Sequence, residues 1–223
     1  MSIHNDDDIV LPDGRTLGDL LAEDTRKYDN VKRVPSHHGT LYTYTGKVLF
    51  PDGAPSLLDM AVSLSREGRY AGAGFRFWPV ALHSFVVCDL LPDHLKWDGL
   101  VHDSPEVITG DTPKPAKTDE IEAFEEELLT SIYRAFHVEM PSVCQRNAIK
   151  NADRAAFRGE VYTVGNHALQ EHYGRWEEAE DLILGYANQY TYEDMLESSG
   201  RVPMEFMRRF RTYMNMLDKN RVL

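Results

Sequence analysis

Cysteine is scarce in this chain, which has only Cys88 and Cys144 among its 223 residues. Two cysteines cannot build a disulfide framework or a four-cysteine zinc site. Both lie in apolar stretches of the sequence, so we expect both to be buried thiols in a reducing compartment.

An excess of positive charge is also absent, because 24 basic residues stand against 36 acidic ones and give a formal net charge of −12. This charge excludes a favoured partnership with a nucleic-acid polymer or an anionic membrane, although a local basic pocket could still hold a small anion. No apolar run approaches the ~20 residues of a membrane span. The first residues, MSIHNDDDIV, lack the basic and apolar regions of a signal peptide. These absences predict a cytoplasmic protein.

What the sequence does contain is helical periodicity. Hydrophobic residues make up 42% of the chain and charged residues 27%, as in ordinary globular proteins. We predict an all-α fold with an N-terminal extension (1–41), a core (42–165) and a C-terminal helical segment (166–223). The expected elements are a short helix at Thr16–Asp24, a strand or hairpin arm at Thr40–Phe50, and helices at Leu57–Glu67, Val80–Leu91, His94–Ser104, Thr118–Phe136, Pro141 to about Glu160, and Pro203–Leu217.

Three separate features could ligate a metal. His102-Asp103 is an adjacent pair that can place an imidazole nitrogen and a carboxylate oxygen on one cation. His83 lies 19 residues earlier on an apolar helix, and Asp153 lies 50 residues after Asp103. Taken singly, these features are more typical of a surface pair, a hydrogen-bonded core histidine and a surface ion pair. Taken together, they form an ordered His, His-Asp, Asp set on three predicted helices.

This set extends into a longer run, H-D-x-x-E-x-x-x-G-D-x-P-x-P-x-K, from His102 to Lys117. The run resembles the HD-domain metal-dependent phosphohydrolases, and most closely the bacterial 5′-deoxynucleotidases and the phage-type nucleotide hydrolases, including dATP triphosphohydrolases. Leu64-Ser65-Arg66 and Arg69 match a further pattern of these proteins. The resemblance covers roughly 42–160 and implies an HD-domain helical bundle in the cytoplasm of a bacterial or phage-infected cell.

The resemblance implies that one divalent transition metal is bound by His83, His102, Asp103 and Asp153. Two imidazoles and two carboxylates suit zinc, cobalt, manganese or nickel, so the identity of the metal stays open. Such a metal activates water and polarises phosphate. Activity should fall at acid pH, because the imidazoles must be neutral to bind the metal.

The same resemblance gives roles to neighbouring residues. Glu106 would be a general acid or base, and if the helix continues past His102 it lies on the same side. Asp111 would orient the water or the substrate sugar. Arg69 would bind phosphate or sugar, as a guanidinium can.

Three aromatic or basic residues are further candidates for substrate contact. Tyr70 would lie beside the base, Trp78 would line the pocket and Lys117 would contact a phosphate. A tryptophan that precedes a helix is more often a core residue, and a lysine in a proline-rich loop is more often solvated, so both of these bland interpretations stay open.

The sequence thus favours a small-nucleotide phosphohydrolase, most simply one acting on the 5′-phosphate ester of deoxynucleoside monophosphates. Other interpretations are a triphosphohydrolase of dNTPs, a hydrolase of alarmones or cyclic nucleotides, and a non-catalytic nucleotide-binding module. The expected partner is the nucleotide itself. We also expect a homo-oligomer, because the resembling proteins are commonly oligomeric; the stripe of Met207, Phe210, Met214 and Leu217 would pack on the core or join subunits.

Overall fold

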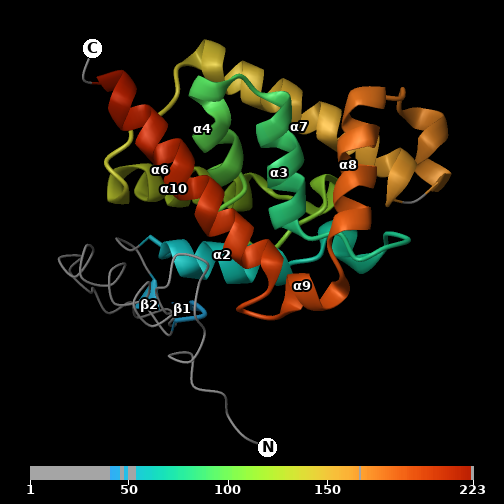
Figure 1. Cartoon of the computed structure of the whole chain (residues 1–223), viewed down its shortest axis with the longest axis horizontal. Helices are drawn as coiled ribbons and strands as arrows, with labels where there is room; N and C mark the ends of the chain where they lie inside the picture. The colour runs from blue at the N-terminus through green and yellow to red at the C-terminus, as the bar shows by residue number, and fades with distance from the viewer. Residues whose placement is uncertain (1–40, 46–47, 50–53, 166, 222–223) are drawn as a thin grey trace, which may run out of the picture.

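The computed structural model describes residues 41–45, 48–49, 54–165 and 167–221 (Figure 1). The predicted helix at Thr16–Asp24 lies outside these residues. The all-α prediction is confirmed, because the described chain is mainly helical. The helices are α2 (Leu57–Arg66), α3 (Val80–Leu90), α4 (Lys96–Val101), α5 (Glu106–Thr109), α6 (Asp119–Ala135), α7 (Val143–Thr163), α8 (Glu177–Gln189), α9 (Tyr192–Leu196) and α10 (Arg201–Arg221). Short 3₁₀ helices occupy Arg69–Gly72 (η2), Asp93–Leu95 (η3), Lys114–Ala116 (η4) and His167–His172 (η5).

A small hairpin precedes the helices. Strands β1 (Leu41–Tyr42) and β2 (Val48–Leu49) pair antiparallel, within the arm that the sequence predicts. The backbone N–H of Thr45 donates to Asp59 Oδ1 at 2.8 Å. Because Asp59 also completes the N-terminal capping box of α2 with Ser56, one buried carboxylate both starts this helix and holds the hairpin against it.

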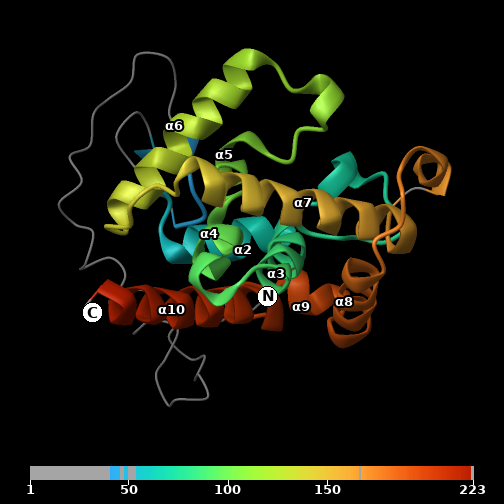
Figure 2. The same cartoon turned by 90° about the horizontal axis from the view of Figure 1, so that it is seen from above.

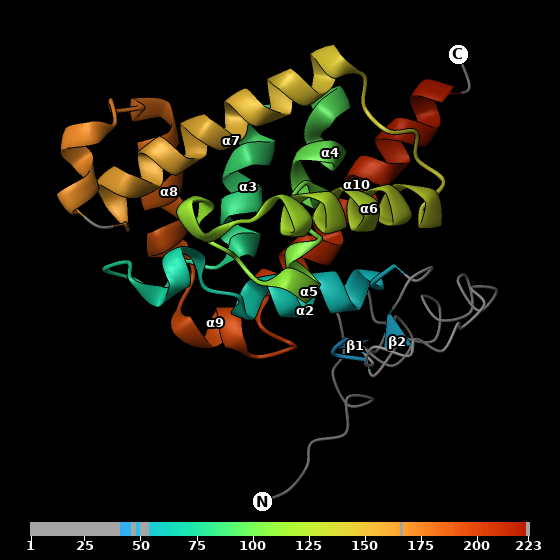
Figure 3. The same cartoon turned by 180° about the vertical axis from the view of Figure 1, so that it is seen from behind.

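Helix α3 forms the centre of the bundle. Every residue from Val80 to Cys88 is buried, as expected for a helix that is apolar around its whole circumference. Figure 2 shows α3 and α4 between α7 on one side and α10 on the other, and Figure 3 shows α6 on the side facing away from α10. The polar side chains of His83 and Ser84 on α3 are therefore enclosed by its neighbours.

Most predicted helix starts are confirmed, with one helix shorter than expected. Ser56, Pro79, Thr118 and Ser142 occupy the N-cap positions of α2, α3, α6 and α7. The helix predicted at His94–Ser104 instead begins as η3 and ends at Val101 in α4. The chain then turns through 102–105, and the next helix starts after Pro105.

Helix α10 packs along α2 and α4. Its apolar stripe of Met207, Phe210, Met214 and Leu217 therefore packs against the core of the bundle. Met207 and Phe210 are buried, and the ring of Phe210 meets the rings of Trp97 and Phe136 edge-on at centroid distances of 5.6 and 4.7 Å. Met214 and Leu217 also pack against this core. The expected homo-oligomer stays a prediction.

The two cysteines differ in environment. Cys88 is buried in α3, as predicted, but the prediction for Cys144 is wrong because its side chain is exposed. Cys144 lies in the first turn of α7, where Val143 is also 67% exposed, so this turn projects beyond the core. Among the described helices, none combines the length and apolar composition that crossing a membrane requires.

Candidate metal centre

Helix α3 supplies the most deeply buried ligand candidate. His83 is fully buried, and its Nδ1 lies 2.6 Å from Oε1 of Glu160 on α7. A carboxylate can only accept, so Nδ1 carries the proton and Nε2 is the free ligand nitrogen. This Nε2 is buried and has no hydrogen-bond partner among the described residues.

The turn after α4 supplies the second imidazole. His102 Nδ1 donates to the carbonyl oxygen of Gly99 at 2.8 Å, which leaves its Nε2 unpartnered too. A side chain at Gly99 would meet Leu91 at 2.6 Å, so this glycine allows the close approach of α4 to α3. The close packing brings the two histidine rings to 5.4 Å between centroids.

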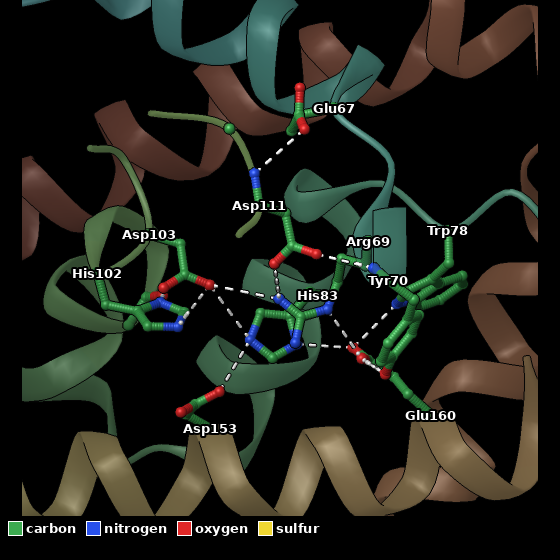
Figure 4. Close-up of polar contacts among 12 residues, drawn as sticks. Glu67, Arg69, Tyr70, Trp78, His83, His102, Asp103, Asp111, Asp153 and Glu160 are labelled. Carbon is green, nitrogen blue, oxygen red and sulfur yellow. Dashed lines mark hydrogen bonds and ion pairs between the residues drawn. The ribbon is translucent and has the colours of Figure 1, made fainter. Parts of the chain in front are cut away.

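Two carboxylates close the cluster (Figure 4). Oδ2 of Asp103 lies 3.2 Å from Nε2 of His102 and 3.5 Å from Nε2 of His83. Oδ1 of Asp153, on α7, lies 3.2 Å from the same nitrogen of His83. The candidate ligand atoms of His83, His102 and Asp153 all lie within 4.8 Å of one another.

These four residues fit a divalent cation by the chemistry of their free atoms. Two buried imidazole nitrogens without partners face two carboxylate oxygens, and a cation with nitrogen and oxygen ligands would satisfy all of them. The described residues thus offer a group that could hold a metal ion.

The electrostatics of the cluster favour positive charge. Burial disfavours a protonated His83, yet the nearby Glu160 and Asp153 outweigh burial and raise the pKa of His83 to about 10. The pKa of His102 is likewise raised, against burial, mainly by Asp103. The pKa of Asp103 is lowered well below its usual range, against burial, mainly by His102. A field that favours a proton on these imidazoles also favours a cation between them.

Metal binding is therefore expected to release protons. A raised histidine pKa means that the metal-free protein holds protons that an incoming cation must displace, so apparent affinity should rise with pH, by about tenfold per pH unit for each proton released. Calorimetry of Zn²⁺ binding in two buffers of different ionisation enthalpy measures this release. His94→Asn changes an exposed histidine and should leave the release unchanged; equal heats in both buffers would contradict the prediction.

Glu160 is a part of the site that the sequence did not reveal. This carboxylate is fully buried and lies seven residues after Asp153, two turns along the same face of α7. Besides His83, it accepts from Trp78 Nε1 at 2.9 Å, Arg69 Nε at 3.0 Å and Tyr70 Oη at 2.5 Å. The spacing from Asp153 is the one signal that could have indicated it, because Glu160 otherwise marks only the approximate end of a predicted helix.

Arg69 and Tyr70, the two residues predicted to contact phosphate or sugar and the base, lie beside the cluster and are held by protein groups. Arg69 is mostly buried, and its Nη1 lies 3.6 Å from carboxylate oxygens of Asp103 and Asp111 in addition to the bond with Glu160. Tyr70 has a φ of 62°, in the left-handed region that non-glycine residues rarely adopt. Its backbone N–H donates to Asp111 Oδ2 at 2.8 Å, which stabilises this strained conformation.

Two predicted substrate contacts are corrected by their positions. Trp78 is only 2% exposed and its indole N–H is bonded to Glu160, so it is a core residue behind the cluster. Nζ of Lys117 pairs with Oε2 of Glu125 at 2.5 Å, because α6 brings that carboxylate next to the η4 turn. Trp78 therefore packs in the core rather than lining an open pocket, and the ammonium group of Lys117 is already paired with a carboxylate.

Glu106 and Asp111 follow the cluster in the chain, although no helix continues from His102 to Glu106. Glu106 is buried, its Oε2 has no hydrogen-bond partner, and burial together with the charge of Asp103 raises its pKa to about 10. Asp111 accepts from Tyr70, and its own N–H donates to Glu67 Oε1 at 3.1 Å. Oε2 of Glu106 therefore has no hydrogen-bond partner within the described part of the chain. The carboxylate of Asp111, in contrast, already fixes the loop (Figure 4).

Comparisons with known proteins add little to this geometry. No protein-family model matches the chain. A stretch of 79 residues is 34% identical to YfdR of Escherichia coli (strain K12), which is described as an uncharacterised protein. This stretch covers 34% of the chain and 44% of YfdR, so the match spans less than half the length of either protein.

Proposed function

We propose that this chain is a metal-dependent phosphohydrolase of the HD-domain type that hydrolyses the 5′-phosphate ester of deoxynucleoside monophosphates. The observation that carries the proposal is the convergence of two unpartnered imidazole Nε2 atoms with the carboxylates of Asp103 and Asp153. The run from His102 to Lys117 supports the same assignment from the sequence.

The ligands of the cation would be His83, His102, Asp103 and Asp153. A divalent cation held there would supply Lewis acidity toward a phosphate oxygen and lower the pKa of water. Zinc, cobalt, manganese and nickel all suit this mixture of nitrogen and oxygen atoms.

Glu106 is the residue that would move a proton. Burial raises the pKa of Glu106 and favours a protonated carboxyl, and its Oε2, which has no partner among the described residues, can give that proton to the 5′ oxygen of the leaving nucleoside. Water provides the oxygen that joins phosphorus as the phosphorus–oxygen ester bond breaks, so the products are a nucleoside and inorganic phosphate. Arg69, already beside Asp103, would place positive charge near the phosphate.

A specific observation favours the monophosphate over the triphosphate. Additional phosphates need additional positive charge, and Lys117 is the residue that the sequence suggested for it. Because Lys117 is paired with Glu125, its charge is already compensated. A triphosphohydrolase of dNTPs remains the second candidate, supported by the resemblance to phage-type enzymes.

A substrate panel tests the proposal. We expect Co²⁺- or Mn²⁺-loaded protein to release inorganic phosphate from dNMPs, with slower or no release of triphosphate from dNTPs; product chromatography separates the two reactions. The panel also includes a guanosine tetraphosphate and cyclic dinucleotides, which test the alternative that the chain hydrolyses alarmones or cyclic nucleotides. Tight nucleotide binding without any turnover would contradict the enzyme proposal and favour a non-catalytic nucleotide-binding module.

A further inference from the structure

The interior of the bundle contains one carboxylate that receives hydrogen bonds from three different elements. Oε1 of Glu160 accepts from Trp78 and from His83, and Oε2 accepts from Arg69 and Tyr70. These donors come from η2, from the segment before α3 and from α3 itself. Figure 4 shows the four side chains converging on Glu160.

Two of these donors determine that both oxygens of the Glu160 carboxylate act as hydrogen-bond acceptors. Indole Nε1–H and guanidinium Nε–H can donate but never accept. Trp78 supplies such a donor to Oε1 and Arg69 supplies one to Oε2. Each oxygen is thereby an acceptor, and the ion pair with Arg69 compensates the negative charge within the core.

His83 has no freedom of tautomer in this environment. Its Nδ1 faces an oxygen that already accepts from Trp78, so Nδ1 must be protonated and Nε2 is left for the cluster. We propose that Glu160 is a positioning residue that delivers Nε2 of His83 to the bound cation by holding the proton on Nδ1. This inference rests on the metal site of the proposed function, but on none of its hydrolytic chemistry.

The substitution Glu160→Gln tests this role with almost no change in shape. The amide NH₂ must replace one of the two oxygens, and it then faces either Arg69 or Trp78, each of which can only donate. If it faces Trp78, Nδ1 of His83 becomes an acceptor and the proton moves to Nε2. If it faces Arg69, His83 keeps only a bond to a neutral amide oxygen. In both cases we expect Zn²⁺ affinity to fall about 10–100-fold, measured by competition with a chelator.

Nuclear magnetic resonance can distinguish a positioning role of Glu160 from a purely structural one, because it reports which nitrogen of His83 carries the proton. In ¹⁵N-histidine-labelled wild type loaded with Zn²⁺, we expect His83 to bind the ion through Nε2 and to keep a slowly exchanging proton on Nδ1. In the metal-free protein the same Nδ1 proton should be shifted strongly downfield, and Glu160→Gln should remove that shift. Coordination through Nδ1 in the wild type would overturn the proposal even if the variant does not fold.

Two control variants separate positioning from stability. Trp78→Phe removes another donor from the same carboxylate oxygen but leaves the His83 bond, so it should lower the melting temperature while keeping Zn²⁺ affinity within a few-fold. Glu178→Gln changes an exposed residue of α8 and should alter neither property. Equal losses of affinity in Trp78→Phe and Glu160→Gln would contradict the proposal.

The outcomes also separate this inference from the proposed function. If wild type binds Zn²⁺ through Nε2 and Glu160→Gln weakens binding, the inference holds even when no nucleotide is hydrolysed. If nucleotides are hydrolysed but Glu160→Gln keeps full affinity and the Nδ1 proton, the inference fails and the function stands.

Discussion

Replacing Asp103 with alanine is expected to abolish retention of a divalent cation. Oδ2 of Asp103 is the carboxylate oxygen that approaches the free nitrogens of both His83 and His102. Removing it takes away a ligand atom and leaves two buried imidazoles and Arg69 with less negative charge to balance them. Elemental analysis after dialysis measures the metal content, which should be stoichiometric in the wild type and undetectable in Asp103→Ala.

Asp93→Ala is the matched control for this variant. Asp93 is 75% exposed in η3, and its side chain pairs only at the surface with Lys96. This change should leave metal content and melting temperature unaltered. Full metal occupancy in Asp103→Ala, with Asp153 and the histidines intact, would remove Asp103 from the ligand set.

Replacing Glu106 with glutamine is expected to keep the metal and lower the rate of phosphate release by at least ~100-fold, the scale of general acid–base catalysis. Glutamine keeps the shape of the side chain but has no proton to give. The buried Oε2 of Glu106 has no partner in the described structure, so the substitution breaks no hydrogen bond there. The fold and the metal content should therefore stay near those of the wild type.

Glu122→Gln serves as the control for Glu106, because Glu122 is exposed in the first turn of α6. Single-turnover kinetics with a dNMP, at saturating metal, isolates the chemical step. An unchanged rate in Glu106→Gln would exclude Glu106 as the proton donor. Loss of both rate and metal would instead make Glu106 part of the metal site.

The helix boundaries show how far local sequence signals reach. Ser56, Thr118 and Ser142 are N-cap residues whose side chains bond the first turn. The sequence predicts that these three helices start at Leu57, Thr118 and Pro141, and they start at Leu57, Asp119 and Val143. Capping depends only on residues a few positions away, so the sequence suffices. The helix expected at His94–Ser104 is too long, because periodicity alone does not reveal the turn that follows Val101.

The candidate site is predictable where its residues form a recognisable run, and less so elsewhere. His102, Asp103, Glu106 and Asp111 belong to one run, so their shared location follows from the sequence. Trp78 and Lys117 are sequence candidates for substrate contact because aromatic and basic residues suit nucleotides. Their actual partners are carboxylates: Glu160 is distant in sequence from Trp78, and Glu125 meets Lys117 because α6, which begins at Asp119, places this carboxylate beside the end of η4.

The sequence by itself determined the all-α class, most helix starts and three candidate ligands, His83, His102 and Asp153, whose ligand atoms lie together in the structure. The class and the helix starts depend on periodicity and capping, whereas the candidate ligands are indicated by the ordered His, His-Asp, Asp set and by its resemblance to a known family. Only the tertiary structure decided that His83 presents Nε2, that Arg69 is held by carboxylates and that Glu160 joins them. These facts depend on contacts across as many as 91 positions of the chain, which arise when α7 packs on α3 and carry no local pattern.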